Sequence, residues 1–254
     1  MATGNRLGGR VAIVTGAGGP RGIGRAIALA LARERAGVVV AGGRAADQVA
    51  GEIADMGQPS LRLRTDVSRE SDVRSMVERT LEAFGQVDVL VNNAGILLRG
   101  GLLEVTVSDW ERTLAVNLTG VLLCSQAVVR PMIERGAGGR IVNISSLCAH
   151  TGCPSQLSYA ASKGGVEAMT LALAVDLAQY GITVNAIAPG GVYTGMATAP
   201  PPPGQEPARW GGQPIPVSGL PQDVAGAAVM LASEEAGWIT GTVLVVDGGK
   251  LAGR

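Results

Sequence analysis

Aromatic side chains, histidine and net charge are all scarce in this sequence. Phe, Trp and Tyr make up 3% of the 254 residues, and His150 is the single histidine. A Ser-His-Asp triad would need that one residue as its base, unless another residue replaces it. Lys plus Arg and Asp plus Glu both total 21, so the chain has no formal net charge. Because there is also no basic run, neither nucleic acid nor an anionic membrane is expected as the main partner.

Cysteines and long apolar segments are sparse as well. The three cysteines, Cys124, Cys148 and Cys153, are an odd number without metal-ligand spacing. They predict reduced thiols in a cytoplasmic protein, and no metal site. No apolar stretch reaches the length of a transmembrane helix, and residues 1–10 lack the apolar core of a signal peptide. We therefore expect a cytoplasmic protein without a membrane partner.

Apolar residues, in contrast, make up 46% of the chain and form a regular alternation. Short Val/Ile-rich runs, several almost continuously apolar, predict strands that are buried on both faces. The expected strands are 11–15, 38–42, 60–65, 87–92, 140–145, 183–188 and 243–246. The expected helices are 23–35, 45–56, 70–84, 108–135, 157–180 and 222–232. This alternation predicts an α/β fold: a single domain over residues 1–254 with a doubly wound, parallel, seven-stranded sheet and helices on both faces.

Two local signals refine this pattern. Ser108 opens the run Ser-Asp-Trp-Glu, a capping-box pattern that marks the start of the helix over 108–135. Residues 198–216 are dense in Pro and Gly, which predicts a long surface loop. Long loops of this kind can gate chemistry, so we expect a substrate lid around residues 195–216.

A glycine-rich turn, Thr-Gly-Ala-Gly-Gly-Pro-Arg-Gly-Ile-Gly over residues 15–24, joins the first strand to the first helix. Glycines there permit tight backbone angles and let a pyrophosphate approach the amide groups at the helix N-terminus. A plain strand-to-helix turn is the alternative. The strand before the turn and the helix after it are the context in which such a motif indicates a dinucleotide site.

The end of the second strand distinguishes between two dinucleotides. NAD is held there by an acidic residue that hydrogen-bonds the adenosine ribose, but residues 40–44 read Val-Ala-Gly-Gly-Arg. Arg44 and Arg21 could instead receive a 2′-phosphate, because a guanidinium suits phosphate oxygens. We therefore expect NADP(H) rather than NAD(H). The alternative is that both arginines are ordinary surface residues.

Tyr159 and Lys163 lie four residues apart in the expected helix over 157–180, a spacing that places both side chains on one face. A lysine ammonium beside a phenol favours the phenolate and is expected to lower the pKa of the tyrosine. A tyrosine of that kind can act as an acid or a base near neutral pH. On an exposed helix, however, the same spacing is usually part of a solvated face.

Short motifs follow the third to sixth strands in order: Asp66-Val67, Asn92-Asn93-Ala94-Gly95, Asn143-Ile144-Ser145-Ser146 and Pro189-Gly190-Gly191-Val192-Tyr193-Thr194. Asn117 lies in the long helix between the second and third of them, and Ser146 precedes Tyr159 by thirteen residues. In order and spacing, these motifs resemble the short-chain dehydrogenase/reductase family over nearly the whole chain. The resemblance is closest to bacterial 3-oxoacyl-acyl-carrier-protein reductases.

The resemblance implies a dinucleotide site of the Rossmann type. The implied cofactor contacts are Gly16, Arg21, Gly22, Ile23, Gly24, Arg44, Asp66, Val67, Asn93, Ala94, Gly95, Tyr159, Lys163, Pro189, Gly190, Val192 and Thr194. One departure concerns the glycine turn. The family usually has three residues between its first Thr-Gly pair and the following Gly-x-Gly. In this chain, five residues lie between Gly16 and Gly22. No phosphate contact is therefore assigned to residues 17–20.

Four residues would carry the chemistry, according to the resemblance. Tyr159 would be the general acid in ketone reduction and the general base in alcohol oxidation. Lys163 would bind the nicotinamide ribose and lower the pKa of Tyr159. Ser146 would hydrogen-bond the substrate oxygen, and Asn117 would hold a water that links Lys163 to solvent. The alternatives are a helix cap for Ser146, a polar helix residue for Asn117 and a surface lysine for Lys163.

The sequence indicates the substrate less clearly than it indicates the reaction. The candidate substrate contacts are Ser146, Cys148, Cys153, Tyr159, Met196 and Trp210, while His150 is interpreted as loop filling. The implied activity is hydride transfer between NADP(H) and a ketone or secondary alcohol. Carrier-protein reductases commonly place a basic residue where this chain has Tyr180, which favours a free ketone over a carrier-protein thioester. Arg130 and Arg135 could nevertheless bind an acidic partner.

Two further expectations concern the protein as a whole. A non-catalytic dinucleotide-binding sensor or scaffold is the alternative from a different class, although such proteins often lose the tyrosine or the lysine that this chain retains. Members of the family typically pair the long helices that correspond to residues 108–135 and 157–180. The resemblance therefore implies a homo-oligomer, either a dimer or a tetramer, that acts on a small molecule.

Overall fold

The computed structural model describes residues 4–43, 45–194 and 213–253. Within them, one parallel sheet of seven strands has the order β3-β2-β1-β4-β5-β6-β7. The strands are β1 (Val11–Thr15), β2 (Gly37–Gly42), β3 (Ser60–Arg64), β4 (Val89–Asn92), β5 (Gly139–Ile144), β6 (Ile182–Pro189) and β7 (Val243–Val246). The strand order reverses at β1, which pairs with both β2 and β4. In sheets of this kind, ligands bind outside the carboxyl ends of the strands at that point.

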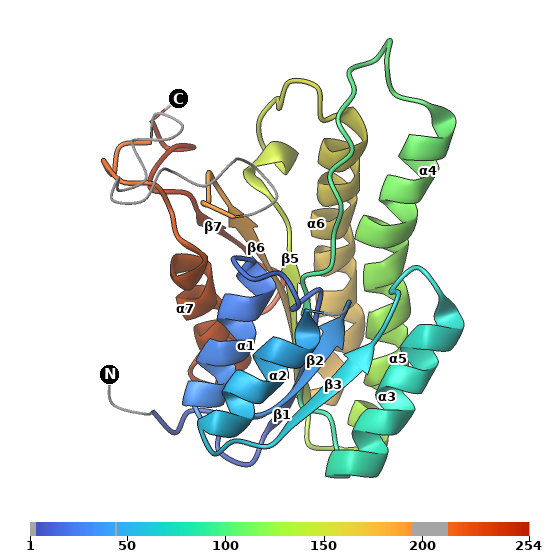
Figure 1. Cartoon of the computed structure of the whole chain (residues 1–254), viewed down its shortest axis with the longest axis vertical. Coiled ribbons are helices and arrows are strands. Elements are labelled where there is room, and N and C mark those ends of the chain that lie inside the picture. The colour runs from blue at the N-terminus through green and yellow to red at the C-terminus, as the bar shows by residue number, and fades with distance from the viewer. Residues whose placement is uncertain (1–3, 44, 195–212, 254) are drawn as a thin grey trace.

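Helices cover both faces of the sheet, as Figure 1 shows. On one face lie α1 (Ile23–Arg33), α2 (Ala46–Asp55) and α7 (Pro221–Ala232), which share a buried apolar cluster with the strands. On the other face lie α3 (Glu70–Phe84), α5 (Gly120–Arg135) and α6 (Leu157–Leu177), which share a second cluster. Every residue of β1 is buried because successive side chains alternate between these two clusters. The expected doubly wound fold is confirmed.

One continuous helical segment, Val107–Arg135, is built from α4 (Val107–Leu114), a π-helical turn η1 (Ala115–Thr119) and α5. The sequence pattern placed its start at Ser108, and that assignment was wrong by one residue. Thr106 is the N-cap: its hydroxyl accepts a hydrogen bond from the Asp109 amide at 3.1 Å. Thr106 and Ser108 both stand three residues before an acidic residue, so the capping pattern fits either one.

The same segment overturns a second expectation. By length and mean hydropathy, 1.3 over an 18-residue window, Val107–Arg135 could cross a membrane, so the view that no stretch is long enough was wrong. In the structure, α4 packs against α6, while α5 packs against α3, β4 and β5. The core helix of a soluble protein can pass the same hydropathy test. This helix contributes Cys124, Val128 and Met132 to one of the two cores.

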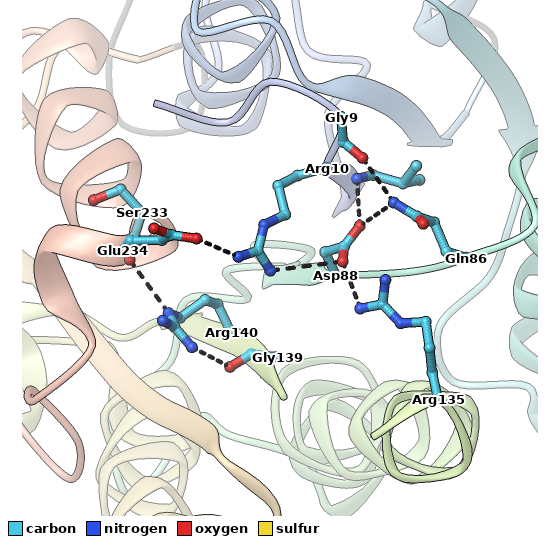
Figure 2. A network of polar contacts seen from close by, with 10 residues as sticks. Gly9, Arg10, Gln86, Asp88, Arg135, Gly139, Arg140, Ser233 and Glu234 are labelled. Carbon is cyan, nitrogen blue, oxygen red and sulfur yellow. Dashed lines mark hydrogen bonds and ion pairs between the residues drawn. The ribbon is translucent and has the colours of Figure 1, made fainter. Parts of the chain in front are cut away.

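A buried polar network ties the amino ends of the strands together (Figure 2). Asp88, which is 1% exposed, lies at its centre. One of its carboxylate oxygens accepts hydrogen bonds from the Val11 amide at 2.7 Å and from the Gln86 side chain at 2.8 Å. The other lies 2.5 Å from the Arg135 guanidinium and 3.7 Å from that of Arg10. The network therefore joins the start of β1, the start of β4 and the last turn of α5.

Candidate active site

A cavity of about 1100 Å³ opens at the carboxyl ends of the strands. It is lined by every predicted cofactor and substrate contact in the described part of the chain: Gly16, Arg21, Gly22, Ile23, Gly24, Asp66, Val67, Asn93, Ala94, Gly95, Ser146, Cys148, Cys153, Tyr159, Lys163, Pro189, Gly190, Val192 and Thr194. Arg44, Met196 and Trp210 lie outside the described residues, as does most of the expected lid. Segments that are distant in the sequence thus meet around one hollow.

The glycine turn is shaped by close backbone contacts. Gly16 has a φ of +67°, and a Cβ at this position would lie 2.6 Å from the Ala94 Cα. A Cβ on Gly24 would lie 2.3 Å from the Asn93 side-chain nitrogen. Because no side chain fits at either site, both positions require glycine.

The structure also shows where the longer turn places its extra residues. The Ala17 amide donates a hydrogen bond to the Ala41 carbonyl at 3.3 Å, and a Cβ on Gly18 would lie 2.9 Å from the Ala46 amide nitrogen. Residues 17 and 18 therefore pack against β2 and the start of α2. Gly19 and Pro20 line the cavity instead.

The N-terminus of α1 suits the pyrophosphate of a nicotinamide dinucleotide. Gly22 is the N-cap, and no side chain caps the helix. The first amide groups of a helix have no partner within it and carry partial positive charge, which favours a bound anion. Gly22, Ile23 and Gly24 all line the cavity. This uncapped helix N-terminus fits the pyrophosphate. The nicotinamide of the same dinucleotide would supply or accept the hydride when bound.

Thr15 is a site residue that the sequence reasoning missed. Its hydroxyl accepts hydrogen bonds from the amides of Asn93 and Ala94 at 3.0 and 3.1 Å and lies 3.3 Å from the Val91 carbonyl. The Asn93 side chain in turn donates to the Thr15 carbonyl at 2.9 Å. These contacts join the ends of β1 and β4, where the strand order reverses. The signal in the sequence was a polar residue that ends an apolar strand.

Ser146, Tyr159 and Lys163 converge on the cavity. Ser146 follows β5 and lies close enough to Tyr159 to influence its pKa, while the Lys163 ammonium lies 5.6 Å from the centre of the Tyr159 ring. Lys163 is 4% exposed, and its ammonium donates a hydrogen bond to the Ile144 carbonyl at 2.6 Å. It is therefore not a surface lysine. Ser146 also caps the short 3₁₀ turn η2 (Leu147–Ala149) by accepting from the Cys148 amide at 3.2 Å.

Burial changes the acid–base properties of this pair. It raises the pKa of Tyr159 above its usual value of 10.0, and the Ser146 side chain lowers that pKa by less than burial raises it. The expectation that Lys163 lowers the pKa of Tyr159 was therefore wrong for the protein alone. Burial also lowers the pKa of Lys163 to about 8, because the interior disfavours the ammonium. The sequence showed the helical spacing of the two residues but not the depth at which they lie.

The pKa of Lys163 predicts a pH dependence for cofactor binding. If the ammonium holds the cofactor, affinity should be constant below pH 8 and fall as the pH rises through about 8, where Lys163 becomes neutral. The limiting slope is about tenfold per pH unit for one proton. Fluorescence titration of the cofactor between about pH 6 and 10 measures this. Lys163→Met should bind weakly with a flat profile, and a flat wild-type profile would contradict the prediction.

Asn117 lies behind the cavity and does not line it. Its side-chain oxygen accepts from the Ile96 amide at 2.8 Å, and its nitrogen donates to the Ile96 carbonyl at 2.9 Å and to Ser162 at 3.1 Å. A Cβ on Gly95 would be 3.4 Å from that oxygen and 3.7 Å from the Lys163 nitrogen. Asn117 and Lys163 therefore approach each other across Gly95. The π-helical turn η1 provides this placement.

Ser145 and Ser146 have different surroundings, although they are neighbours. The Ser145 hydroxyl is buried and donates to the Glu167 carboxylate at 2.6 Å, while Glu167 also lies 3.0 Å from the His150 ring nitrogen. The Ser145 hydroxyl is thus hydrogen-bonded to a residue of α6, whereas Ser146 lies beside Tyr159 and lines the cavity. His150 pairs with Glu167 and ties the loop before α6 to the helix.

Cys148 and Cys153 form a disulfide, whereas Cys124 is free and buried. The expectation of reduced thiols was therefore wrong for this pair. Spacing alone does not show that the loop folds back on itself between Ser146 and α6. A closed loop this short would stabilise the fold by roughly 2 kcal/mol in the chain-entropy view. Both residues line the cavity, so the bridge shapes its wall.

In the described ranges, no group of three or more His, Cys, Asp or Glu could hold a metal.

Comparisons with known proteins agree with this geometry. A family model described as Enoyl-(Acyl carrier protein) reductase matches residues 16–250. A 3-oxoacyl-[acyl-carrier-protein] reductase of Synechocystis is 42% identical, with 94% of this chain and 96% of that protein covered. A cis-4-hydroxycyclohexanecarboxylate dehydrogenase of Sinomonas cyclohexanicum is 41% identical, with 96% and 97% covered. A short-chain type dehydrogenase/reductase of Mycobacterium marinum has a solved structure with a TM-score of 0.87 at 35% identity, covering 96% of each chain. The chain therefore belongs to the short-chain dehydrogenase/reductase family, enzymes that act on alcohol and carbonyl groups with a nicotinamide dinucleotide.

Proposed function

We propose that this enzyme transfers a hydride between NADP(H) and a ketone or secondary alcohol, with Tyr159 as the general acid and base. The observation that carries the proposal is the convergence of Ser146, Tyr159 and Lys163 on the cavity that the glycine turn also lines. The chain forms one dinucleotide-binding domain over residues 1–254 in this proposal. A panel of ketones, followed by NADPH absorbance, tests the activity.

Each side chain has a separate task in this proposal. Ser146 donates a hydrogen bond from its hydroxyl to the carbonyl oxygen and holds that oxygen near Tyr159. The Tyr159 hydroxyl gives its proton to the developing alkoxide in reduction and takes it back in oxidation. Lys163 binds the ribose hydroxyls. Asn117 holds a water through which the proton is replaced from solvent.

The preference for NADP(H) rests on the end of β2 and on the glycine turn. Gly42 and Gly43 line the cavity where an acid would bind the ribose of NAD, and Arg21 of the glycine turn lines the same cavity. We expect the specificity constant for NADP(H) to exceed that for NAD(H) by about tenfold or more, because a charged hydrogen bond to phosphate contributes about 1.5–3 kcal/mol. Steady-state kinetics with both cofactors measures this ratio, and Arg21→Gln should narrow it. An equal or better constant with NAD(H) would refute the preference.

An acyl-carrier-protein thioester is the second candidate substrate, because the Synechocystis relative is named as a reductase of that substrate. The Sinomonas relative is instead named for a free hydroxy acid, so these names leave the substrate open. Tyr180 occupies the position at which the carrier-protein enzymes commonly have a base, which favours a free ketone. Activity on a carrier-protein thioester well above that on free ketones would overturn this preference.

A non-catalytic sensor or scaffold is the alternative from another class. It would bind the cofactor tightly and oxidise no NADPH across the whole panel.

We also propose a homo-oligomer, dimer or tetramer, because α6 leaves Leu171 and Val175 exposed at 52% and 78%.

A cytoplasmic location stays a prediction. Cytoplasmic thiol systems keep cysteines reduced, so that location conflicts with a permanent Cys148–Cys153 bridge.

A further inference from the structure

The charges around the cavity are strongly unbalanced. Four cationic side chains line it, those of Arg21, Arg99, Lys163 and Lys250, whereas Asp66 is the one carboxylate among its described lining residues. Asp66 is occupied by its own turn, because its carboxylate accepts hydrogen bonds from the Ser68 amide at 3.0 Å and the Ser68 hydroxyl at 2.6 Å. The remainder of the described lining thus has positive charge without any counter-charge. A cavity of this kind concentrates anions.

Two of these cations are not needed for the dinucleotide site described above. Arg21 lies in the glycine turn, and Lys163 lies beside Tyr159. Arg99 and Lys250 come from different segments, the loop after β4 and the turn after β7. Arg99 is exposed and Lys250 is half-buried, and within the described part of the chain neither side chain forms a hydrogen bond or an ion pair.

Arg99 is held beside the helix that carries Tyr159. Its neighbour Gly100 pairs with the chain just before α6: the Gly100 amide donates to the Ser155 carbonyl at 2.9 Å, and the Leu157 amide donates to the Gly100 carbonyl at 3.4 Å. Gln156, the partner in this bridge, lines the cavity three residues before Tyr159. The backbone therefore anchors Arg99 at the end of the cavity where the chemistry takes place.

Lys250 is anchored in a similar way from another segment. The Asp247 carboxylate accepts hydrogen bonds from the Gly249 amide at 2.8 Å and the Leu251 amide at 2.7 Å, so it fixes the turn on either side of Lys250. Gly190 packs directly against Asp247, since a Cβ there would lie 2.6 Å from the Asp247 Cβ. This contact places the turn beside the segment from Pro189 to Val192, which also lines the cavity.

Resting on the proposed function, we propose that the ketone or alcohol substrate carries a carboxylate, which Arg99 binds and to which Lys250 adds a second positive charge. A guanidinium presents two parallel donors that match the two oxygens of a carboxylate. The anionic end of the substrate is thereby fixed while its carbonyl lies at Ser146 and Tyr159. Fixing both ends orients the reacting carbon.

The test compares keto acids with their methyl esters. The probes are acetoacetate, levulinate and the next two longer keto acids of the same series, each as the acid and as the methyl ester. They are assayed with the wild type and with the variants Arg99→Gln, Arg99→Lys and Lys250→Gln. Arg79→Gln is the matched control, because Arg79 is exposed on α3 and does not line the cavity. For wild type, we expect at least one acid to exceed its ester in kcat/KM by about tenfold or more.

Arg99→Gln should raise the KM of that acid by about ten- to hundredfold, with little change in kcat and no change for the ester. Arg99→Lys should restore part of the loss, and Lys250→Gln should have a smaller effect of the same kind. If every ester matches its acid, or if Arg99→Gln affects both equally, the inference is overturned while the ketone reductase activity stands. If neither acids nor esters react although cofactor binds, both the inference and the proposed function fail.

Discussion

Tyr159→Phe is expected to lower kcat by about 10² to 10⁴-fold in both reaction directions, the usual contribution of a positioned general acid or base. Phenylalanine keeps the ring beside the Lys163 ammonium, which lies 5.6 Å from the ring centre, but removes the hydroxyl that exchanges the proton. Cofactor affinity should stay within a few-fold, because the glycine turn and Lys163 are untouched. Turnover and cofactor titration on the same preparation measure both.

The matched control for this variant is Tyr180→Phe. Tyr180 ends the 3₁₀ turn η3 (Ala178–Tyr180) and is 42% exposed, so losing its hydroxyl should leave kcat unchanged. Near-normal turnover in Tyr159→Phe would refute the assignment of the acid and base. Loss of cofactor binding together with turnover would instead mean that the substitution had damaged the site.

Asp88→Ala should destabilise the fold by about 3 kcal/mol, at the lower end of the cost of breaking a buried ion pair. The carboxylate is 2% exposed, and it satisfies Arg135, Arg10 and the Val11 amide together (Figure 2). The lower end applies because both arginine side chains are about a quarter exposed and can regain water. For a chain of this length, the melting temperature should fall by about 6–12 °C. Thermal and urea unfolding measure the change.

Glu234→Ala is the matched control for Asp88→Ala. Glu234 also pairs with Arg10, at 2.9 Å, but its side chain is 81% exposed. An exposed pair of this kind contributes about 0–1 kcal/mol. If Asp88→Ala destabilised no more than Glu234→Ala, the buried network would not hold the amino ends of the strands together.

The elements of the sheet followed from the sequence because their pattern is local. The runs 11–15 and 243–246 are the observed bounds of β1 and β7, and 70–84 are those of α3. Continuous apolar runs signal burial on both faces, and Gly85 ends α3 with a φ of +73°. Among the other elements, some ends also agree and the rest differ by one to three residues. The start of α4 was misplaced because two hydroxyl residues satisfy one capping pattern.

The site could be predicted only in part. Motif order placed the segments around one cavity, because each follows the carboxyl end of a parallel strand. Spacing could not show that residues 17 and 18 of the glycine turn pack against β2 and α2, or that Thr15 joins β1 to β4. These contacts join residues far apart in the chain, and no local pattern encodes them.

The sequence by itself determined the α/β fold, the order of its elements and the residue types that meet around the cavity, because periodicity and motif spacing are properties of the chain. Only the tertiary structure decided how deeply the site residues are buried and which of them lie close together. Burial raises the pKa of Tyr159 and lowers that of Lys163 to about 8, and loop folding joins Cys148 to Cys153. Arg99 and Lys250 likewise reach the cavity only through backbone contacts made in the folded chain, since desolvation and approach depend on neighbours that are distant in sequence.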